Sequence, residues 1–175
     1  LIMNLFVWND DMTSQIPVVV TPASSQDFLN TGDWQTRWNT PEITAMPNKV
    51  GLHRADDGEL LGLMSYRLDE RGMAVEVVYV ESAGHSNANL LRQNNRPKKY
   101  YGIAKALFAY AIGVSVDAGF GGVLFFRAKT TELRSYYMKE FGAVPLGQYD
   151  PFRMIIWEDA AEQIVSEYKA VNENG

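Results

Sequence analysis

The stretch AVEVVYVE at Ala74–Glu81 is followed by a polar loop, then by KYYGIA at Lys99–Ala104 and by VLFF at Val123–Phe126. Apolar residues recur at helical spacing after Gly102, which predicts a wide apolar helical face. A short, continuous apolar run such as Val123–Phe126 is typical of a strand buried on both faces. The order strand, helix, strand therefore predicts a crossover unit inside an α/β sheet.

The residues before this stretch predict a strand, a helix and an antiparallel meander. Ser24, Ser25 and Asp27 offer capping oxygens for a helix that runs toward Trp34. The segment Thr36–Asn48 has no sustained period and predicts an irregular helix or loop. The expected strands are Pro17–Thr21, Val50–Arg54, Leu60–Leu68 and Ala74–Glu81.

The residues after it predict two helices and two strands. Thr130 or Thr131 can cap a helix through Lys139, and Gly142 can end it. Further strands are expected at Val144–Gln148 and Phe152–Trp157, and a last amphipathic helix at Ala160–Val171. With no repeat and no long linker, we expect one domain over residues 1–175, with residues 1–16 an extension of uncertain structure. The fold class is α/β, with a mixed, mostly antiparallel central sheet and flanking helices.

Composition excludes several classes of function. The 175 residues carry a formal net charge of -5, which opposes binding to nucleic acid through many neutralised phosphates. The chain has no cysteine and two histidines, so we expect no disulfide, thiolate nucleophile or metal site. The apolar start Leu1–Trp8 lacks a basic segment and is followed by Asn9-Asp10-Asp11, which opposes a signal peptide or membrane span. We expect a cytoplasmic protein that acts away from membranes.

The corner at Gly102 favours an anionic ligand. Glycine at a helix start lets the backbone approach a ligand closely, and the first amides of a helix have no partner within it. These amides and the helix dipole together attract a group such as pyrophosphate. A glycine before a helix is also common in simple turns, so the corner needs support from its neighbours.

That support comes from a resemblance. Lys99-x-x-Gly102-x-Ala104 resembles the Gln/Arg-x-x-Gly-x-Gly/Ala motif of GNAT acetyltransferases, which use acetyl-CoA as acetyl donor. The resemblance implies that Tyr79, Val80 and Glu81 align the pantetheine arm and that a splayed strand pair opens the acetyl slot. It also implies that pyrophosphate meets a run of four residues after the lysine: Tyr101, Gly102, Ile103 and Ala104.

Two departures from the family pattern concern the ligand sites. Lys99 stands where the family has Gln or Arg, and the loop between Ala83 and Lys98 is longer than usual. The longer loop suggests an acceptor site bordered by His85 and Asn87. Lys129, with Arg134, is a candidate contact for coenzyme phosphates.

Catalysis requires a base for the protonated acceptor amine and an acid for the departing thiolate. Glu81 and Glu76 are the alternative bases, because their spacing places them on opposite faces of a strand. We favour Glu81, which lies at the strand end beside the long loop. The resemblance implies a tyrosine acid on the following helix, either Tyr137 or Tyr136.

The sequence thus predicts an N-acetyltransferase in which a primary amine attacks acetyl-CoA directly in a ternary complex. The acceptor is a small-molecule or peptide amine, and a homodimer is left open. A catalytically silent CoA-binding regulatory or interaction module is the alternative. A third reading, an unrelated nucleotide at Gly102, is weakened because the chain has neither a P-loop nor a full G-x-G-x-x-G pattern.

Overall fold

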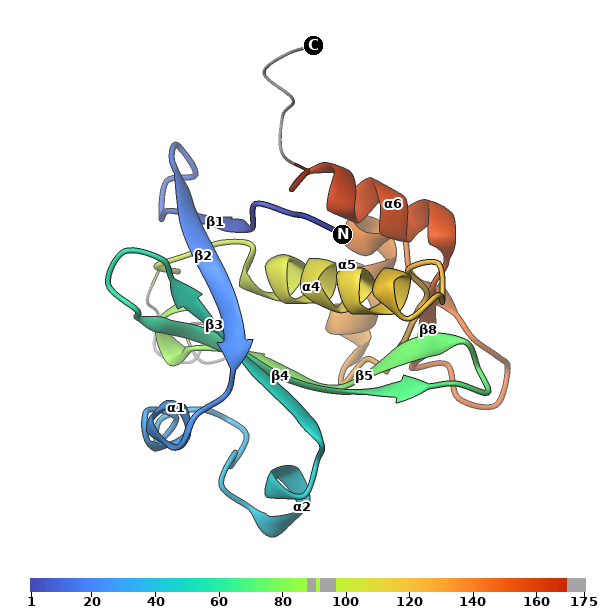
Figure 1. The fold of residues 1–175 in the computed structure, drawn as a ribbon, viewed down its shortest axis with the longest axis horizontal. Helices are drawn as coiled ribbons and strands as arrows, with labels where there is room; N and C mark the ends of the chain where they lie inside the picture. The colour runs from blue at the N-terminus through green and yellow to red at the C-terminus, as the bar shows by residue number, and fades with distance from the viewer. Residues whose placement is uncertain (88–90, 92–96, 170–175) are drawn as a thin grey trace. The chain divides into compact units, whose positions relative to one another are not determined.

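A computed structural model describes residues 1–87, 91 and 97–169 (Figure 1). It is a mixed α/β structure with an eight-stranded sheet in the order β1-β2-β3-β4-β5-β6-β8-β7. Strands β5 and β6 pair in parallel, whereas β1–β2, β2–β3, β6–β8 and β7–β8 pair antiparallel. The predicted fold class is confirmed. The elements are β1 (Phe6–Trp8), β2 (Gln15–Pro22), α1 (Ser25–Leu29), α2 (Pro41–Thr44), β3 (Asn48–Arg54), β4 (Leu60–Asp69), β5 (Ala74–Ser82), η1 (Gly84–Ser86), α4 (Ile103–Asp117), β6 (Leu124–Arg127), α5 (Thr131–Phe141), β7 (Val144–Pro145), β8 (Arg153–Ile156) and α6 (Glu158–Ser166).

The chain forms two compact units. Unit 1 comprises Leu1–Asn4, Tyr66–Val78 and Phe108–Gly175, and unit 2 comprises Leu5–Ser65 and Tyr79–Leu107. Strands β4 and β5 and helix α4 contribute residues to both units. Nearly all residues that the sequence connects with ligand binding belong to unit 2.

Unit 2 begins with a strand that the sequence did not predict. Residues Phe6–Trp8 form β1 and pair antiparallel with Gln15–Pro17 of β2. Trp8 also exchanges two backbone hydrogen bonds with Tyr101, of 2.8 and 3.0 Å. Val7, in the middle of β1, is completely buried. Part of the expected extension 1–16 is therefore an ordered strand that reaches the segment just before α4.

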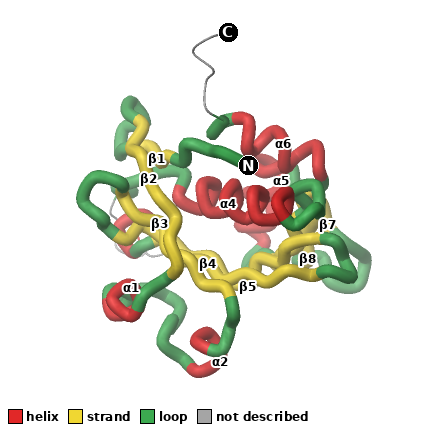
Figure 2. Tube along the Cα trace, viewed as in Figure 1, coloured by secondary structure: helices red, strands yellow, loops and turns green. Residues whose placement is uncertain are grey.

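Helix α1 starts where the sequence predicted and ends earlier (Figure 2). Ser24 is the N-cap and forms a reciprocal capping box with Asp27. The helix ends at Leu29, although its expected run extended toward Trp34. The backbone amides of Gln35 and Thr36 instead donate to Glu81, so this segment is held as a loop. Trp34 and Trp38 of this segment belong to an apolar cluster with Ile43, Leu60, Leu63 and Ala83.

Unit 1 contains the predicted crossover. Val75–Val77 of β5 pair in parallel with Leu124–Phe126 of β6. Phe108 of α4 contacts Phe126, Tyr137 and Phe141, with ring centroids 5.0–5.5 Å apart. This aromatic core joins α4 and α5 to β6.

The ends of unit 1 elements follow local chemistry. Thr130 caps α5 by accepting from the Leu133 amide, and Gly142 ends the helix in the left-handed conformation with φ 65°. Strand β7 covers Val144–Pro145 and not the predicted Val144–Gln148, although the Leu146 amide still donates to the Arg153 carbonyl of β8 at 2.8 Å. Helix α6 begins two residues earlier than predicted and ends at Ser166, while residues 170 and 171 of the predicted helix lie outside the described residues.

None of the helices in the described part of the chain has the length and apolar character needed to cross a bilayer.

Candidate functional site

The end of β5 in unit 2 carries a buried carboxylate. Glu81 is 6% exposed, and its Oε2 accepts from the Gln35 amide at 2.7 Å. Its Oε1 accepts from the Thr36 amide at 2.9 Å and from the Trp38 indole at 3.3 Å. Three donors on one loop therefore fix the carboxylate, and the carboxylate in turn fixes the loop to the strand.

The start of α4 offers backbone amides. Gly102 has φ 89°, in the left-handed region that favours glycine, and a Cβ there would meet only Trp8 Cδ1, at 3.9 Å. Among the described residues, no partner is found for the amides of Gly102, Ile103 and Ala104. The amide of Tyr101 is different, since it donates to the Trp8 carbonyl at 3.0 Å. The corner can receive an anion through the three amides that follow Tyr101.

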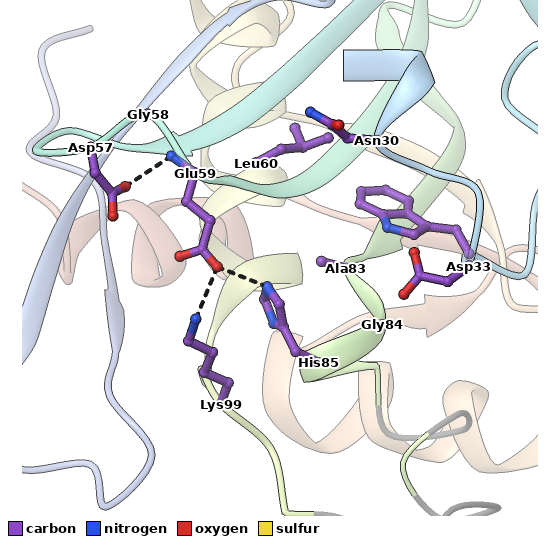
Figure 3. Close-up of a pocket in the computed structure, with 11 residues that line it drawn as sticks. Asn30, Asp33, Asp57, Gly58, Glu59, Leu60, Ala83, Gly84, His85 and Lys99 are labelled. Carbon is purple, nitrogen blue, oxygen red and sulfur yellow. Dashed lines mark hydrogen bonds and ion pairs between the residues drawn. The ribbon is translucent and has the colours of Figure 1, made fainter. Parts of the chain in front are cut away.

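A cavity of about 620 Å³ opens in unit 2 (Figure 3). The loop after α1, the turn between β3 and β4 and the segment after β5 supply its wall. Glu59 lies at the centre of the charged groups, with Lys99 and His85 both directed at it. The lining residues are Asn30, Asp33, Trp34, Asp57, Gly58, Glu59, Leu60, Ala83, Gly84, His85 and Lys99.

The two oxygens of Glu59 have different partners. Oε2 accepts from the Tyr100 hydroxyl at 2.8 Å, and that hydroxyl accepts from Arg54 at 2.8 Å. Oε1 lies 3.1 Å from the Lys99 ammonium and 3.2 Å from Nε2 of His85. One oxygen is thus anchored to the protein, and the other meets the two basic side chains of the cavity.

The hydrogen-bond pattern around His85 assigns its neutral tautomer. The Ser86 hydroxyl accepts from the Tyr100 amide at 2.9 Å and lies 2.8 Å from Nδ1 of His85. Its own proton is then directed at Nδ1, which leaves Nε2 as the donor to Glu59. Burial lowers the pKa of His85, against the opposing charge of Glu59, which favours this neutral form.

Glu59 stays ionised in this arrangement. Burial raises the pKa of Glu59, but the hydrogen bonds from Tyr100 and Lys99 and the charge of Lys99 outweigh it, so the pKa lies below its ordinary value. The hydrogen bond to Glu59 raises the pKa of Lys99. The cavity therefore presents a carboxylate paired with an ammonium.

Comparison with known proteins identifies the fold. No protein-family model matches the sequence, and no curated protein matches it significantly. Among solved structures, that of AtaTR bound with acetyl-CoA matches with a TM-score of 0.55 and 16% identity, over 84% of this chain and 97% of that chain. A GNAT-family acetyltransferase from Listeria monocytogenes matches with a TM-score of 0.54 and 11% identity, over 80% of this chain and 94% of that chain. The chain has the GNAT fold.

Another protein with the GNAT fold is the ribosomal-protein-S18-alanine N-acetyltransferase from Escherichia coli. It matches with a TM-score of 0.51 and 11% identity, over 79% of this chain and 90% of that chain. At such identities the likeness establishes the fold and leaves the activity of this chain to be tested.

The expectation of no nucleic acid does not match one further neighbour. The KacTA–DNA complex matches with a TM-score of 0.51 and 15% identity, over 86% of this chain and 99% of that chain. The GNAT fold thus gives no ground for excluding nucleic acid, and the exclusion depends on the net charge of -5 alone.

Within the GNAT fold, unit 2 brings together several residues that the sequence predicted. Tyr79, Val80 and Glu81 lie near the end of β5. The ring centroids of Tyr79 and Trp38 are 6.3 Å apart. His85 lines the cavity, whereas Asn87 lies beside Gln35, with its amide 3.5 Å from the Gln35 side chain. Residues 88–90 and 92–96 of the long loop lie outside the described residues.

Lys99 lies in the cavity as well as at the first motif position. Its ammonium bonds Glu59 and lies 5.3 Å from the centre of the Tyr100 ring, while its backbone amide donates to the His85 carbonyl. In this arrangement the Lys99 side chain is bonded to Glu59 in the cavity and not directed at the amides that follow Tyr101.

Four predicted residues belong to unit 1. Glu76 forms a two-point ion pair with Arg67, at 2.7 and 3.0 Å. Tyr137 is 6% exposed inside the aromatic core, and burial raises its pKa to about 12, so its hydroxyl keeps its proton at neutral pH. Tyr136 is 42% exposed, and Lys129 is exposed at the end of the segment between β6 and α5.

Sequence reasoning missed the residues at the centre of the cavity. Glu59 follows the turn signal Asp56-Asp57-Gly58, so the sequence alone indicates a carboxylate in a solvated turn. Trp34 was expected at the end of a helix, and Asp33 lies in the loop that replaces that end. The chain separations involved, such as that between Glu59 and Lys99, leave no spacing pattern to detect.

Proposed function

We propose that this chain is an acetyl-CoA-dependent N-acetyltransferase. The observation that carries the proposal is the amide corner at Gly102, Ile103 and Ala104, which opens α4 in a chain with the GNAT fold. Amides at a helix start bind phosphate groups well. The open space at Gly102 fits a diphosphate that approaches the backbone closely.

In the proposed reaction, the coenzyme supplies an acetyl group as a thioester. The acceptor nitrogen forms a bond to the acetyl carbon while the carbon–sulfur bond breaks, so no covalent enzyme intermediate is needed. The nitrogen loses a proton to a carboxylate, for which Glu81 remains our first candidate and Glu76 the second. The thiolate gains a proton from Tyr137 or Tyr136.

The backbone of Tyr79, Val80 and Glu81 is proposed to align the pantetheine arm, beside a splayed strand pair. Lys99 and Lys129 are proposed to meet coenzyme phosphates, which requires Lys99 to leave Glu59. We place the enzyme in the cytoplasm as a single GNAT-like domain.

One observation favours a silent coenzyme-binding module as second candidate. Both oxygens of Glu81 already accept hydrogen bonds from the loop at Gln35–Trp38, and Glu76 is paired with Arg67. A carboxylate occupied in this way is a weaker proton acceptor than a solvated one. The two candidates share coenzyme binding and differ in acetyl transfer.

The test combines calorimetry with turnover on a panel of primary amines. The enzyme binds acetyl-CoA and releases CoA in the presence of an amine, whereas the silent module binds without release. Gly102→Glu adds bulk and negative charge at the amide corner, so we expect coenzyme affinity to fall by at least about tenfold. Gly32→Glu is the control, since a side chain at Gly32 meets nothing within 4 Å. Equal affinity in both variants would remove the coenzyme from this corner.

A second comparison assigns the base. Removal of a general base lowers kcat by about 10²–10⁴-fold, so Glu81→Gln should do so if Glu81 is the base. Because Glu81 also holds the loop, its variant must be checked for a raised KM and lowered melting temperature, which a purely positioning role predicts. Glu76→Gln is the matched variant, and a larger loss of kcat there would transfer the role to Glu76.

A further inference from the structure

The unit 2 cavity has the size and wall of a small-molecule site. Its volume of about 620 Å³ lies within the usual range of roughly 300–1,000 Å³ for ligand pockets. Trp34 and Leu60 supply apolar surface, and the lining contains three carboxylates and one ammonium, those of Asp33, Asp57, Glu59 and Lys99. Asp57 lies 3.8 Å from Arg54, so Asp33 and Glu59 supply most of the negative charge. With His85 neutral, the wall is negative, which favours a cationic ligand.

Glu59 and the Tyr100 ring already form a binding position for an ammonium group, which we call the seat. Oε1 of Glu59 faces the Lys99 ammonium at 3.1 Å, and the Tyr100 ring lies under that ammonium at 5.3 Å. A carboxylate and an aromatic face together are a strong combination for an ammonium group. The position of Glu59 does not depend on Lys99, because the Tyr100 hydroxyl donates to the other Glu59 oxygen and is itself held by Arg54.

Lys99 can leave this seat. Its side chain is 53% exposed, and an exposed ion pair contributes little to stability. Glu59 is more enclosed, at 27%, and keeps its bond to Tyr100 when the lysine moves. An incoming ammonium can therefore take the place of the lysine.

We propose that this cavity binds an acceptor with two amino groups, such as a linear diamine, and that Glu59 selects it by holding the ammonium that does not react. This inference rests on the proposed acetyl transfer. A carboxylate at hydrogen-bond distance stabilises the protonated form of an amine, and a protonated amine cannot attack a thioester. The amine on Glu59 is therefore the anchor, and a second amine on the same molecule is the nucleophile. Lys99 acts as a built-in competitor for the anchor position.

Glu81 holds the loop that carries Trp34, one of the apolar residues of the cavity wall. Trp34 directly precedes Gln35 and Thr36, whose amides donate to Glu81 at 2.7 and 2.9 Å. The same carboxylate that is our candidate base thus positions the apolar wall of the cavity. A diamine bound there lies in a cavity whose wall is fixed to the end of β5.

The experiment measures binding of 1,4-diaminobutane and of butylamine to the full chain without coenzyme, by calorimetry. We expect the diamine to bind at least several-fold more tightly than the monoamine. Glu59→Gln should weaken diamine binding by about tenfold, because it removes the charge and keeps the volume. Glu42→Gln is the matched control on an exposed residue outside the cavity and should leave binding unchanged.

We expect Lys99→Met to change the affinity for the diamine in the opposite direction from Glu59→Gln. Removal of the competing ammonium should strengthen diamine binding by about threefold, an effect that partial unfolding cannot imitate. No diamine binding, equal binding of the two amines, or wild-type binding by Glu59→Gln would overturn the proposal. If the chain also transfers acetyl groups, Glu59→Gln should raise KM for the diamine by a larger factor than KM for butylamine.

The two proposals fail separately. A chain that binds no acetyl-CoA but shows these diamine effects loses the acetyltransferase function and keeps the cavity. A chain that acetylates amines with no dependence on Glu59 keeps the function and loses the diamine inference.

Discussion

The two histidines of this chain are both paired with a carboxylate in unit 2, yet their surroundings differ. His53 Nε2 lies 2.8 Å from Asp27, and the two side chains are 14% and 9% exposed. His85 Nε2 lies 3.2 Å from Glu59, and the side chains are 31% and 27% exposed. We call the first the closed pair and the second the open pair.

Every neighbour of the closed pair has a structural role. Asp27 completes the capping box of α1, Thr21 lies 3.4 Å from the second ring nitrogen of His53, and Gly51 leaves room for the ring. No lining residue of the described cavity belongs to this pair. The same two chemical groups therefore build the fold at one place and face a ligand-sized space at the other, and burial decides which.

The largest expected effect is on stability at the closed pair. Asp27→Asn removes a buried charge from His53 and weakens the α1 cap, so we expect a loss of about 2–3 kcal/mol in the free energy of unfolding. Urea denaturation measures this loss, provided that the free energy of unfolding depends equally on urea concentration in the variant and the wild type. A loss no larger than that of Glu59→Gln would show that the closed pair is not the structural one.

A smaller effect is expected beneath the same pair. A Cβ at Gly51 would lie 2.8 Å from Cε1 of His53 and 3.3 Å from Oδ2 of Asp27, both of which are held in place. Gly51→Ala should therefore cost about 1–2 kcal/mol through overpacking. Gly32→Ala is its control, since nothing lies within 4 Å of a Cβ there. Equal melting temperatures for the two variants would contradict the tight packing that we infer.

The fold was largely predictable because its signals are local. Ser24, Thr130 and Gly142 cap helices as their residue types predict, and the apolar run at Val123–Phe126 forms the parallel partner of β5. Gly102, the glycine of the motif, directly precedes α4 as expected, and its φ of 89° is a feature that the sequence analysis did not predict.

What escaped prediction depends on contacts between distant parts of the sequence. Strand β1 is stabilised by its pairing with β2 and by the bridge between Trp8 and Tyr101. The residue types of Phe6–Trp8 indicate neither contact. Glu81 was predicted as a base from its place at a strand end, and its three donors lie more than forty residues earlier. The open pair joins Glu59 of the turn between β3 and β4 to His85 of η1, so residue type alone could not distinguish Glu59 from a solvated carboxylate.

The open pair should matter little for stability. Glu59→Gln removes one charge from a partly exposed site and keeps an acceptor for the Tyr100 hydroxyl, so we expect a loss below about 1 kcal/mol. Urea denaturation beside Asp27→Asn gives a like-for-like comparison of carboxylate and amide. A loss as large as that at Asp27 would make Glu59 a structural residue and remove the basis for the cavity as a binding site.

The smallest effect is the pH dependence of the open pair, and its sign tests which force dominates. Burial lowers the pKa of His85 in the folded chain below its unfolded value of about 6.5, while the charge of Glu59 opposes this. As pH falls through that value, the unfolded chain takes up a proton that the folded chain does not, so stability falls. The pKa of Glu59 is itself lowered, so its contribution is lost only at more acidic pH.

We therefore expect His85→Gln to lose less stability than the wild type between about pH 7 and about pH 5.5. In Glu59→Gln the loss should be steeper, because the carboxylate that partly compensates burial is gone. If the wild type instead gains stability relative to His85→Gln on acidification, the ion pair outweighs burial, His85 becomes cationic in the cavity, and the negative wall that selects a diamine is weakened.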